Sequence, residues 1–150
     1  MFKKLLNKKL LKNQKGLTLI ELLAVIVILA IIAAIAIPAI GNIIENSRYN
    51  AAKADALNVI NAANIYFTDE GSKDGASVTI KKLLEDNYLE NAGVFVSDTA
   101  SKVDMVSGGN KITGTVKYSG DKTVTFTGAT IAGINEDKQK GSKDLTAIIK

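Results

Sequence analysis

The sequence predicts an α+β protein in which a long N-terminal α-helix lays its second half across a small antiparallel β-sheet. Three observations lead to this fold class. An apolar run covers Leu17 to Ile40, an amphipathic segment follows it directly, and apolar and polar residues alternate after Asn91. A chain of 150 residues has room for one ordinary domain.

The apolar run from Leu17 to Ile40 contains one charged residue, Glu21. As a helix it would be about 36 Å long, enough to cross a hydrocarbon core of about 30 Å with some tilt. Pro38 lies near its end and Gly41 follows shortly after. Because proline removes one helix hydrogen bond, these two positions either end the membrane span or bend the helix there.

The segment from Gly41 to about Phe67 has helical periodicity with one apolar face. We therefore expect one helix of about 50 residues. Its first half is apolar on all sides, and its second half is apolar on one face only. The apolar positions of the second half are Ile43, Ile44, Ala51, Ala54, Leu57, Ile60, Ala63 and Phe67. Residues 68–77 have the composition of a loop.

The remaining elements are short. Thr79 is expected to cap a helix over Ile80–Tyr88, and Leu145–Ile149 is either a final strand or a frayed end. In the best candidate for a hairpin, Ile112, Val116 and Tyr118 share one face and Val124 and Phe126 point the same way on the returning strand. The sheet should have three or four strands, taken from Val94–Val96, Val103–Val106, Lys111–Tyr118 and Lys122–Thr127.

The composition excludes most catalytic chemistry. The chain has no cysteine and no histidine, so it lacks a disulfide framework, thiolate metal ligands and the commonest general base. Its serines and threonines alternate along the predicted strands with no base to activate them. We expect a protein that is not an enzyme and that has no cofactor.

The formal net charge of +4 is misleading as an indication of nucleic-acid binding. Six lysines and no acid lie within residues 1–16, and beyond them thirteen basic side chains face fifteen acidic ones, a balance of −2. A positive segment before an apolar run keeps an N-terminus in the cytoplasm. The lysines of residues 1–16 therefore indicate membrane topology.

The segment KGLTLIELLAVIVILAIIAAIAIPAI, beginning at Lys15, resembles the N-terminal signature of type IV pilins and pseudopilins over roughly residues 14–48. It has a glycine before the cleavage position, a glutamate five positions after it and a proline 22 positions after it. Leu17 departs from the phenylalanine that this family has most often, and we still expect it to be processed. The resemblance implies the pilin-like fold, with residues 1–16 a leader, 17–40 a transmembrane and filament-core helix, and 41–150 the amphipathic half-helix with the globular region.

The resemblance also implies the roles of particular residues. A prepilin peptidase would cut between Gly16 and Leu17 and methylate the new amine of Leu17. Glu21, with Thr18 beside it, would align each subunit as it joins the filament, and the helix would bend at Pro38 and Gly41 on packing. The partners would be further copies of the chain, the peptidase, an assembly platform and motor, and the membrane before assembly, where the N-terminus is cytoplasmic.

Glu21 is unusual on physical grounds alone. A carboxylate in a membrane helix costs about 2.5–3.5 kcal/mol on insertion scales and usually marks function. Cleavage after Gly16 would place a free ammonium on Leu17, which a neighbouring copy could pair with its Glu21. Such a buried pair acts as a register device, because a mis-staggered subunit leaves both charges unpaired. The alternative is a carboxylate that merely lies at the membrane interface.

Several alternatives stay open. Ala34-Ile35-Ala36 offers the small residues of an ordinary secretory cleavage site, and an uncleaved single-pass anchor carrying a binding domain would share the same span. Acids at Asp69, Glu70 and Asp74, or at Glu136 and Asp137, suggest a calcium site, but their spacing does not fit and we expect no metal. The function implied is a structural subunit of an extracellular type IV pilus for adhesion or motility. The alternative is a pseudopilin of type II secretion or of competence, where nucleic acid would be a partner.

Overall fold

The computed structural model describes the backbone of residues 2–95, 100–143 and 146–150, and side chains from Thr18 onward. The chain divides into two compact units, Met1–Gly41 and Asn42–Lys150. The first unit is helical throughout its described residues, and all described strands belong to the second.

Helix α1 spans Phe2–Asp69, a length of 68 residues. It is longer than the predicted 50 residues because residues 2–16 are helical too, and it ends two residues beyond Phe67. The helix is continuous through Pro38 and Gly41. Pro38 therefore does not end the helix, and the bend expected there stays a prediction.

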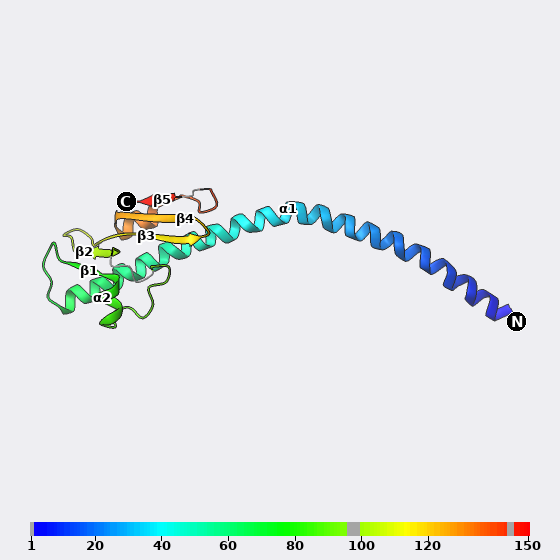
Figure 1. Ribbon diagram of the computed structural model, residues 1–150, viewed down its shortest axis with the longest axis horizontal. Coiled ribbons are helices and arrows are strands. Elements are labelled where there is room, and N and C mark those ends of the chain that lie inside the picture. Colours follow the sequence, from blue (N-terminus) through cyan, green and yellow to red (C-terminus); the bar gives the residue numbers. More distant parts are fainter. Residues whose placement is uncertain (1, 96–99, 144–145) are drawn as a thin grey trace. The chain divides into compact units, whose positions relative to one another are not determined.

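The second unit carries a five-stranded sheet in the order β1-β2-β3-β4-β5 (Figure 1). Neighbouring strands are antiparallel except β4 and β5, which are parallel. The remaining elements are β1 (Ser77–Thr79), α2 (Ile80–Glu85), β2 (Lys102–Asp104), β3 (Lys111–Ser119), β4 (Lys122–Ala129), α3 (Ile131–Glu136) and β5 (Thr146–Ile149). The predicted α+β class, a long helix on a small sheet, is confirmed.

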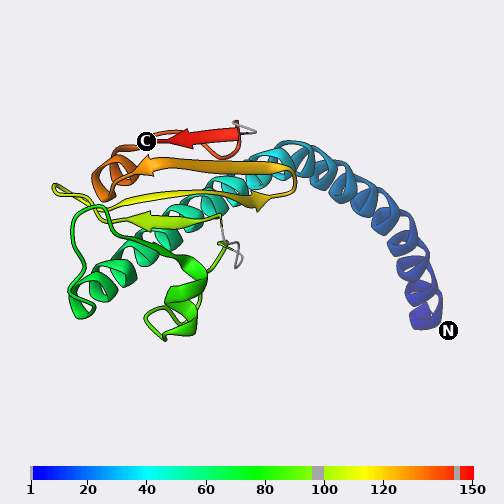
Figure 2. The same ribbon diagram turned by 60° about the vertical axis from the view of Figure 1, so that its left-hand side comes forward.

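The core lies between one face of this sheet and the second half of α1 (Figure 2). From the helix, Ala52, Ala56 and Ala63 are fully buried, and their short side chains let the sheet approach closely. From the sheet, the predicted inward residues of β3 and β4 are all buried: Ile112, Val116, Tyr118, Val124 and Phe126. The alternation in the sequence therefore identified the correct face of both strands.

The predicted strand count was too low. β1 was not predicted: it begins at Ser77, the last residue of the expected loop, and ends at the expected cap Thr79, and its three residues are too few for the alternation to be recognised. The C-terminal segment is a strand and not a frayed end, since Thr146–Ile149 pairs with β4. A parallel neighbour requires a crossover connection, and the turn of helix α3 supplies part of it.

Two other expectations were wrong in part. The described part of Val94–Val96 is a turn in which the amide of Phe95 donates to the carbonyl of Ala92, while Val96 lies outside the described residues. Helix α2 stops at Glu85 and not at Tyr88, because Asn87 adopts a left-handed φ of 60°. The cap at Thr79 is confirmed, since its hydroxyl accepts from the amide of Lys82 at 3.2 Å.

Phe126 should be among the residues on which the fold depends most. It is fully buried and packs against Phe95 with ring centroids 5.5 Å apart. Replacing Phe126 with Ala should lower the free energy of unfolding by about 3–5 kcal/mol. Denaturant unfolding of the full chain in detergent measures this. Thr127→Ala, at an exposed position on the opposite face of β4, is the control and should change it by about 0.5 kcal/mol or less; equal losses in both would contradict this core assignment.

Candidate processing and assembly segment

The first half of α1 has an apolar surface that nothing within its unit covers. An 18-residue window of this helix has a mean hydropathy of 3.2, and none of it is buried. Large apolar side chains are exposed on every side: Leu19, Ile20, Leu22, Leu23, Val25, Ile26, Val27, Ile28, Leu29, Ile31, Ile32, Ile35, Ile37 and Ile40. Within the described part of the chain, this is the one helix long and apolar enough to cross a membrane.

Glu21 lies on this surface and is exposed, as is Thr18. The two residues are three positions apart on a helix, so they share a face. The predicted cleavage position between Gly16 and Leu17 has a helical backbone, and the side chain of Leu17 lies outside the described residues. Glu21 is the one charged residue between Leu17 and Ile44, so no side chain three or four positions away on the helix can form an ion pair with it.

Gly41 stands at the boundary between the two units. A Cβ built on Gly41 would meet nothing within 4 Å, so packing does not require a glycine there. Glycine at this position gives the backbone more conformational freedom. Together with the helix hydrogen bond that Pro38 cannot make, this freedom makes the helix easier to bend here. The predicted bend residues thus lie together just before the folded second unit begins.

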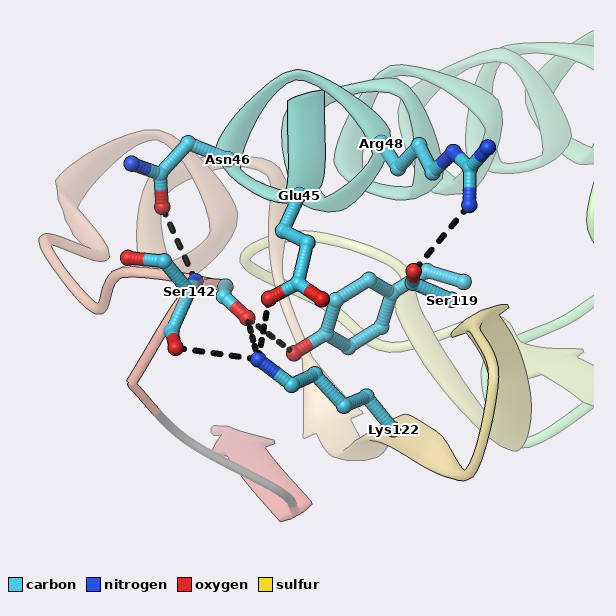
Figure 3. A network of polar contacts seen from close by, with 8 residues as sticks. Glu45, Asn46, Arg48, Ser119, Lys122 and Ser142 are labelled. Carbon is cyan, nitrogen blue, oxygen red and sulfur yellow. Dashed lines mark hydrogen bonds and ion pairs between the residues drawn. The ribbon is translucent and has the colours of Figure 1, made fainter. Parts of the chain in front are cut away.

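A polar junction fastens the start of this second unit (Figure 3). The Lys122 ammonium, on β4, pairs with the Glu45 carboxylate of α1 and donates to the carbonyl oxygens of Gly141 and Ser142 at 2.9 Å each. The amide of Ser142 donates to the side-chain oxygen of Asn46 at 3.0 Å. Helix, sheet and C-terminal loop therefore meet at one largely buried lysine, whose three donors all have acceptors.

Close backbone approach makes this junction feasible. A Cβ on Gly141 would lie 2.4 Å from the Cβ of Tyr49 and 2.9 Å from the Glu45 carbonyl oxygen. Only glycine fits between these atoms, so the loop can rest directly on α1. The hydroxyl of Tyr118 also donates to the Gly141 carbonyl, at 3.0 Å.

A second fastening holds the same loop one or two helix turns further along α1. The Asp137 carboxylate accepts from the Tyr49 hydroxyl at 2.8 Å, from the Lys53 ammonium at 3.2 Å and from the side-chain amide of Gln139 at 2.7 Å. Burial alone would raise the pKa of Asp137, but the hydrogen bonds from Gln139, Tyr49 and Lys53 and the charge of Lys53 outweigh it and hold that pKa below its ordinary value.

Three of the five acids proposed as calcium ligands have other partners. Asp137 is paired with Lys53 as above, Asp69 accepts from the Tyr88 hydroxyl at 3.1 Å, and Asp74 accepts from the Ser107 amide at 2.7 Å. Among the described residues, no group of three or more acids is placed to hold a metal ion. Sequence reasoning missed Lys122 and Glu45, which are 77 positions apart and carry no local signal of their pairing.

A surface pocket of about 490 Å³ lies between the turn at Gly108–Asn110 and the start of α3. Its lining consists of glycine, alanine, isoleucine, threonine and asparagine side chains. None of these is a titratable group that could act as an acid or a base. The pocket therefore offers no catalytic machinery.

The first half of α1 and the folded second unit together define an α+β protein with an apolar N-terminal helix of membrane-spanning length. Residues 11–37 match the family model for the prokaryotic N-terminal methylation motif, the prepilin-type leader of type IV pilins and pseudopilins. The resemblance to that family is confirmed by this match. Comparison with curated proteins and with solved structures found no match.

The Asp137 fastening should make stability depend on pH. Because its pKa is lowered on folding, the contribution of Asp137 is present above the ordinary value of 3.8 and is lost as pH falls through the lower folded value. Unfolding free energy measured by denaturant between pH 6 and pH 2 should drop in this window. In Asp137→Asn the part of the drop due to this residue should disappear; an unchanged pH profile would contradict the assignment.

Proposed function

We propose that the chain is a structural subunit of a type IV pilus, assembled into extracellular filaments for adhesion or surface motility. The observation that carries this proposal is the pairing of the methylation motif at residues 11–37 with an apolar helix that its own unit leaves uncovered. Such a surface is stable in a bilayer or against copies of itself, and not in water. A filament of bundled helices provides the second environment.

Maturation begins with the chain in the cell membrane, its basic leader in the cytoplasm. The peptidase cuts between Gly16 and Leu17 and methylates the amine of Leu17. Cleavage at this point precedes the apolar run and leaves the whole helix on the mature protein. An assembly motor and platform then move the subunit from the membrane into the filament.

Glu21 sets the register of the incoming subunit. Its carboxylate forms an ion pair with the protonated Leu17 amine of a neighbouring copy. Thr18 lies on the same helix face. In an apolar bundle a mis-staggered copy would leave both charges unpaired, which is strongly unfavourable. The pair therefore selects one stagger among the many that apolar packing alone would permit.

The transfer from lipid to filament is feasible because the helix exchanges one apolar environment for another. Helix association in such surroundings depends on close packing, which small residues such as Ala30, Ala33 and Ala34 permit. Pro38 and Gly41 give the helix a point of bending ahead of the fastened segment that begins at Glu45. We propose that the helix adjusts there when the bundle forms.

Electron microscopy of surface material sheared from cells that express the tagged chain tests the proposal. Long filaments that label for the chain support a pilus subunit. Short envelope-bound assemblies with loss of secretion or DNA uptake on deletion would assign it to a pseudopilus instead. A membrane-bound monomer under expressing conditions would contradict both.

Cleavage can be tested at Gly16. A bulky residue, as in Gly16→Leu, should block the peptidase, so that the full-length chain accumulates in the membrane. Intact-mass measurement of the membrane fraction distinguishes the two forms, since the mature chain lacks residues 1–16 and carries a methyl group on Leu17. Mature chain of normal mass in this variant would contradict cleavage at this position.

The register role of Glu21 can be separated from processing. Glu21→Ala should be cleaved and methylated normally, because the cleavage position is unchanged, yet assemble into filaments at least about tenfold less well. Quantitative immunoblots of sheared filaments against total mature chain give the ratio. Wild-type piliation in this variant would show that Glu21 does not set the stagger.

A further inference from the structure

Two loops of the folded second unit carry exposed side chains of opposite charge. The first, residues 138–143, which we call the basic loop, presents Lys138, Lys140 and Lys143, all exposed, and follows the exposed Glu136. The second, residues 69–74, which we call the acidic turn, presents Asp69, Glu70 and Asp74 against the single Lys73. The acidic turn also follows the C-terminus of α1, where helix carbonyl groups add negative potential and the last turn holds no basic residue.

The two loops lie far apart within one chain. The basic loop is fastened to α1 at Asn46, where the Ser142 amide binds, whereas the acidic turn begins at Asp69 where the helix ends. The helical rise between these residues is roughly 35 Å. Charges at such a separation are screened at physiological salt, where the Debye length is about 8 Å. The loops therefore cannot neutralise each other within one copy.

Ion pairs inside the unit leave these two loops unmatched. Three exposed lysines elsewhere pair with nearby acids, in Lys81–Glu85, Lys82–Asp86 and Lys117–Asp121, whereas exposed Lys111 pairs with no acid that the structure describes. Among the described residues, no ion pair involves a lysine of the basic loop or an acid of the acidic turn. Asp144, directly after the basic loop, lies outside the described residues.

The basic loop is also held in one place. The carbonyl groups of Gly141 and Ser142 accept from Lys122, and the amide of Ser142 donates to Asn46. Lys140 and Lys143 flank these fixed residues, and the Lys143 amide donates to the Lys140 carbonyl at 2.9 Å. Their charges are therefore presented on an anchored backbone, which lowers the entropy lost when a partner binds.

We infer that the basic loop of one copy docks on the acidic turn of another copy, as a head-to-tail contact between folded units. The inference rests on the proposed filament. A contact between two different surfaces of one chain is heterologous, and it builds an open helical polymer when its rotation does not close a ring. An anionic polymer is the less favoured partner, since the chain beyond residue 16 carries a net charge of −2 and would repel it as a whole.

A charge exchange between the loops tests this contact. In K140E/K143E and separately in D69K/E70K, like charges would face each other, and filaments per mature subunit should fall by more than about tenfold. The chain with all four substitutions has the wild-type net charge and should recover most of this loss. Asp74 is left unchanged because it accepts from the backbone amide of Ser107, whereas D69K removes only an exposed side-chain hydrogen bond from the Tyr88 hydroxyl.

Matched controls separate the contact from general effects of charge. K81E/K82E changes net charge as much as K140E/K143E but lies on α2, where only exposed ion pairs are lost, and should assemble normally. Far-ultraviolet circular dichroism and the removal of residues 1–16, checked by intact mass, should be unchanged in every variant. The thermal midpoint should fall by only a few degrees, because the variants lose only exposed ion pairs and the exposed hydrogen bond from Tyr88 to Asp69. In wild-type filaments, the contact between the basic loop and the acidic turn should also weaken as the salt concentration rises.

The outcomes distinguish the contact from the filament itself. If wild-type chains form no filaments, the proposed function fails. If filaments form and both charge reversals assemble like wild type, or if the fourfold variant is not rescued, the contact is overturned while the filament stands. Binding of duplex DNA that K140E/K143E removes without changing assembly would assign the basic loop to an anionic polymer and also overturn the contact.

Discussion

An apolar helix with no cover inside its own unit is the constraint on which the rest of the molecule depends. Side chains such as Leu19 and Ile35 are each 72% exposed, and the apolar surface runs around the whole helix. Burial of apolar area contributes roughly 25 cal/mol per Å², so leaving this surface in water would be very unfavourable. The helix must therefore lie in lipid or against other helices, and the folded unit must be stable without help from it.

The second unit meets this requirement with a core of its own. Its part of α1 turns one face to the sheet, where alanines bring the two layers together, and the sheet closes with a parallel strand at its C-terminal edge. The C-terminal loop could not be held by a disulfide because the chain has no cysteine. Polar contacts to Lys122, Asn46 and Lys53 hold it instead, and they place it on α1 close to where the folded unit begins.

These fastenings illustrate what sequence patterns can and cannot predict. Helix α1, the faces of β3 and β4 and the cap at Thr79 follow from periodicity and local hydrogen bonding, which are properties of neighbouring residues. β1 has three residues, too few for periodicity to identify it. α3 has six residues, as α2 does, and its N-cap at Thr130 is the local signal that could have identified it. The parallel pairing of β5 and the pairing of Lys53 with Asp137 join residues that are distant in sequence, and only the folded chain brings them together.

The methylation motif was predicted for a related reason. The residues that we propose for processing and assembly, from Gly16 and Leu17 to Glu21, lie close together in the sequence, so the motif can be recognised without any tertiary contact. Asp137 shows the opposite case, because as one acid in a polar segment it suggested a metal ligand, whereas the fold gives it a lysine and a tyrosine.

The net charge of the chain also hides where the charges lie. The net value of +4 is set by the six lysines within residues 1–16, and the −2 beyond them combines a basic loop with an acidic turn. A sum near zero would suggest a featureless surface, but opposite charges on two distant loops give each copy a direction. In the filament that we propose, apolar packing alone would allow many staggers of the helix. Charged groups would select among these staggers, because an unpaired buried charge costs far more free energy than a displaced methyl group.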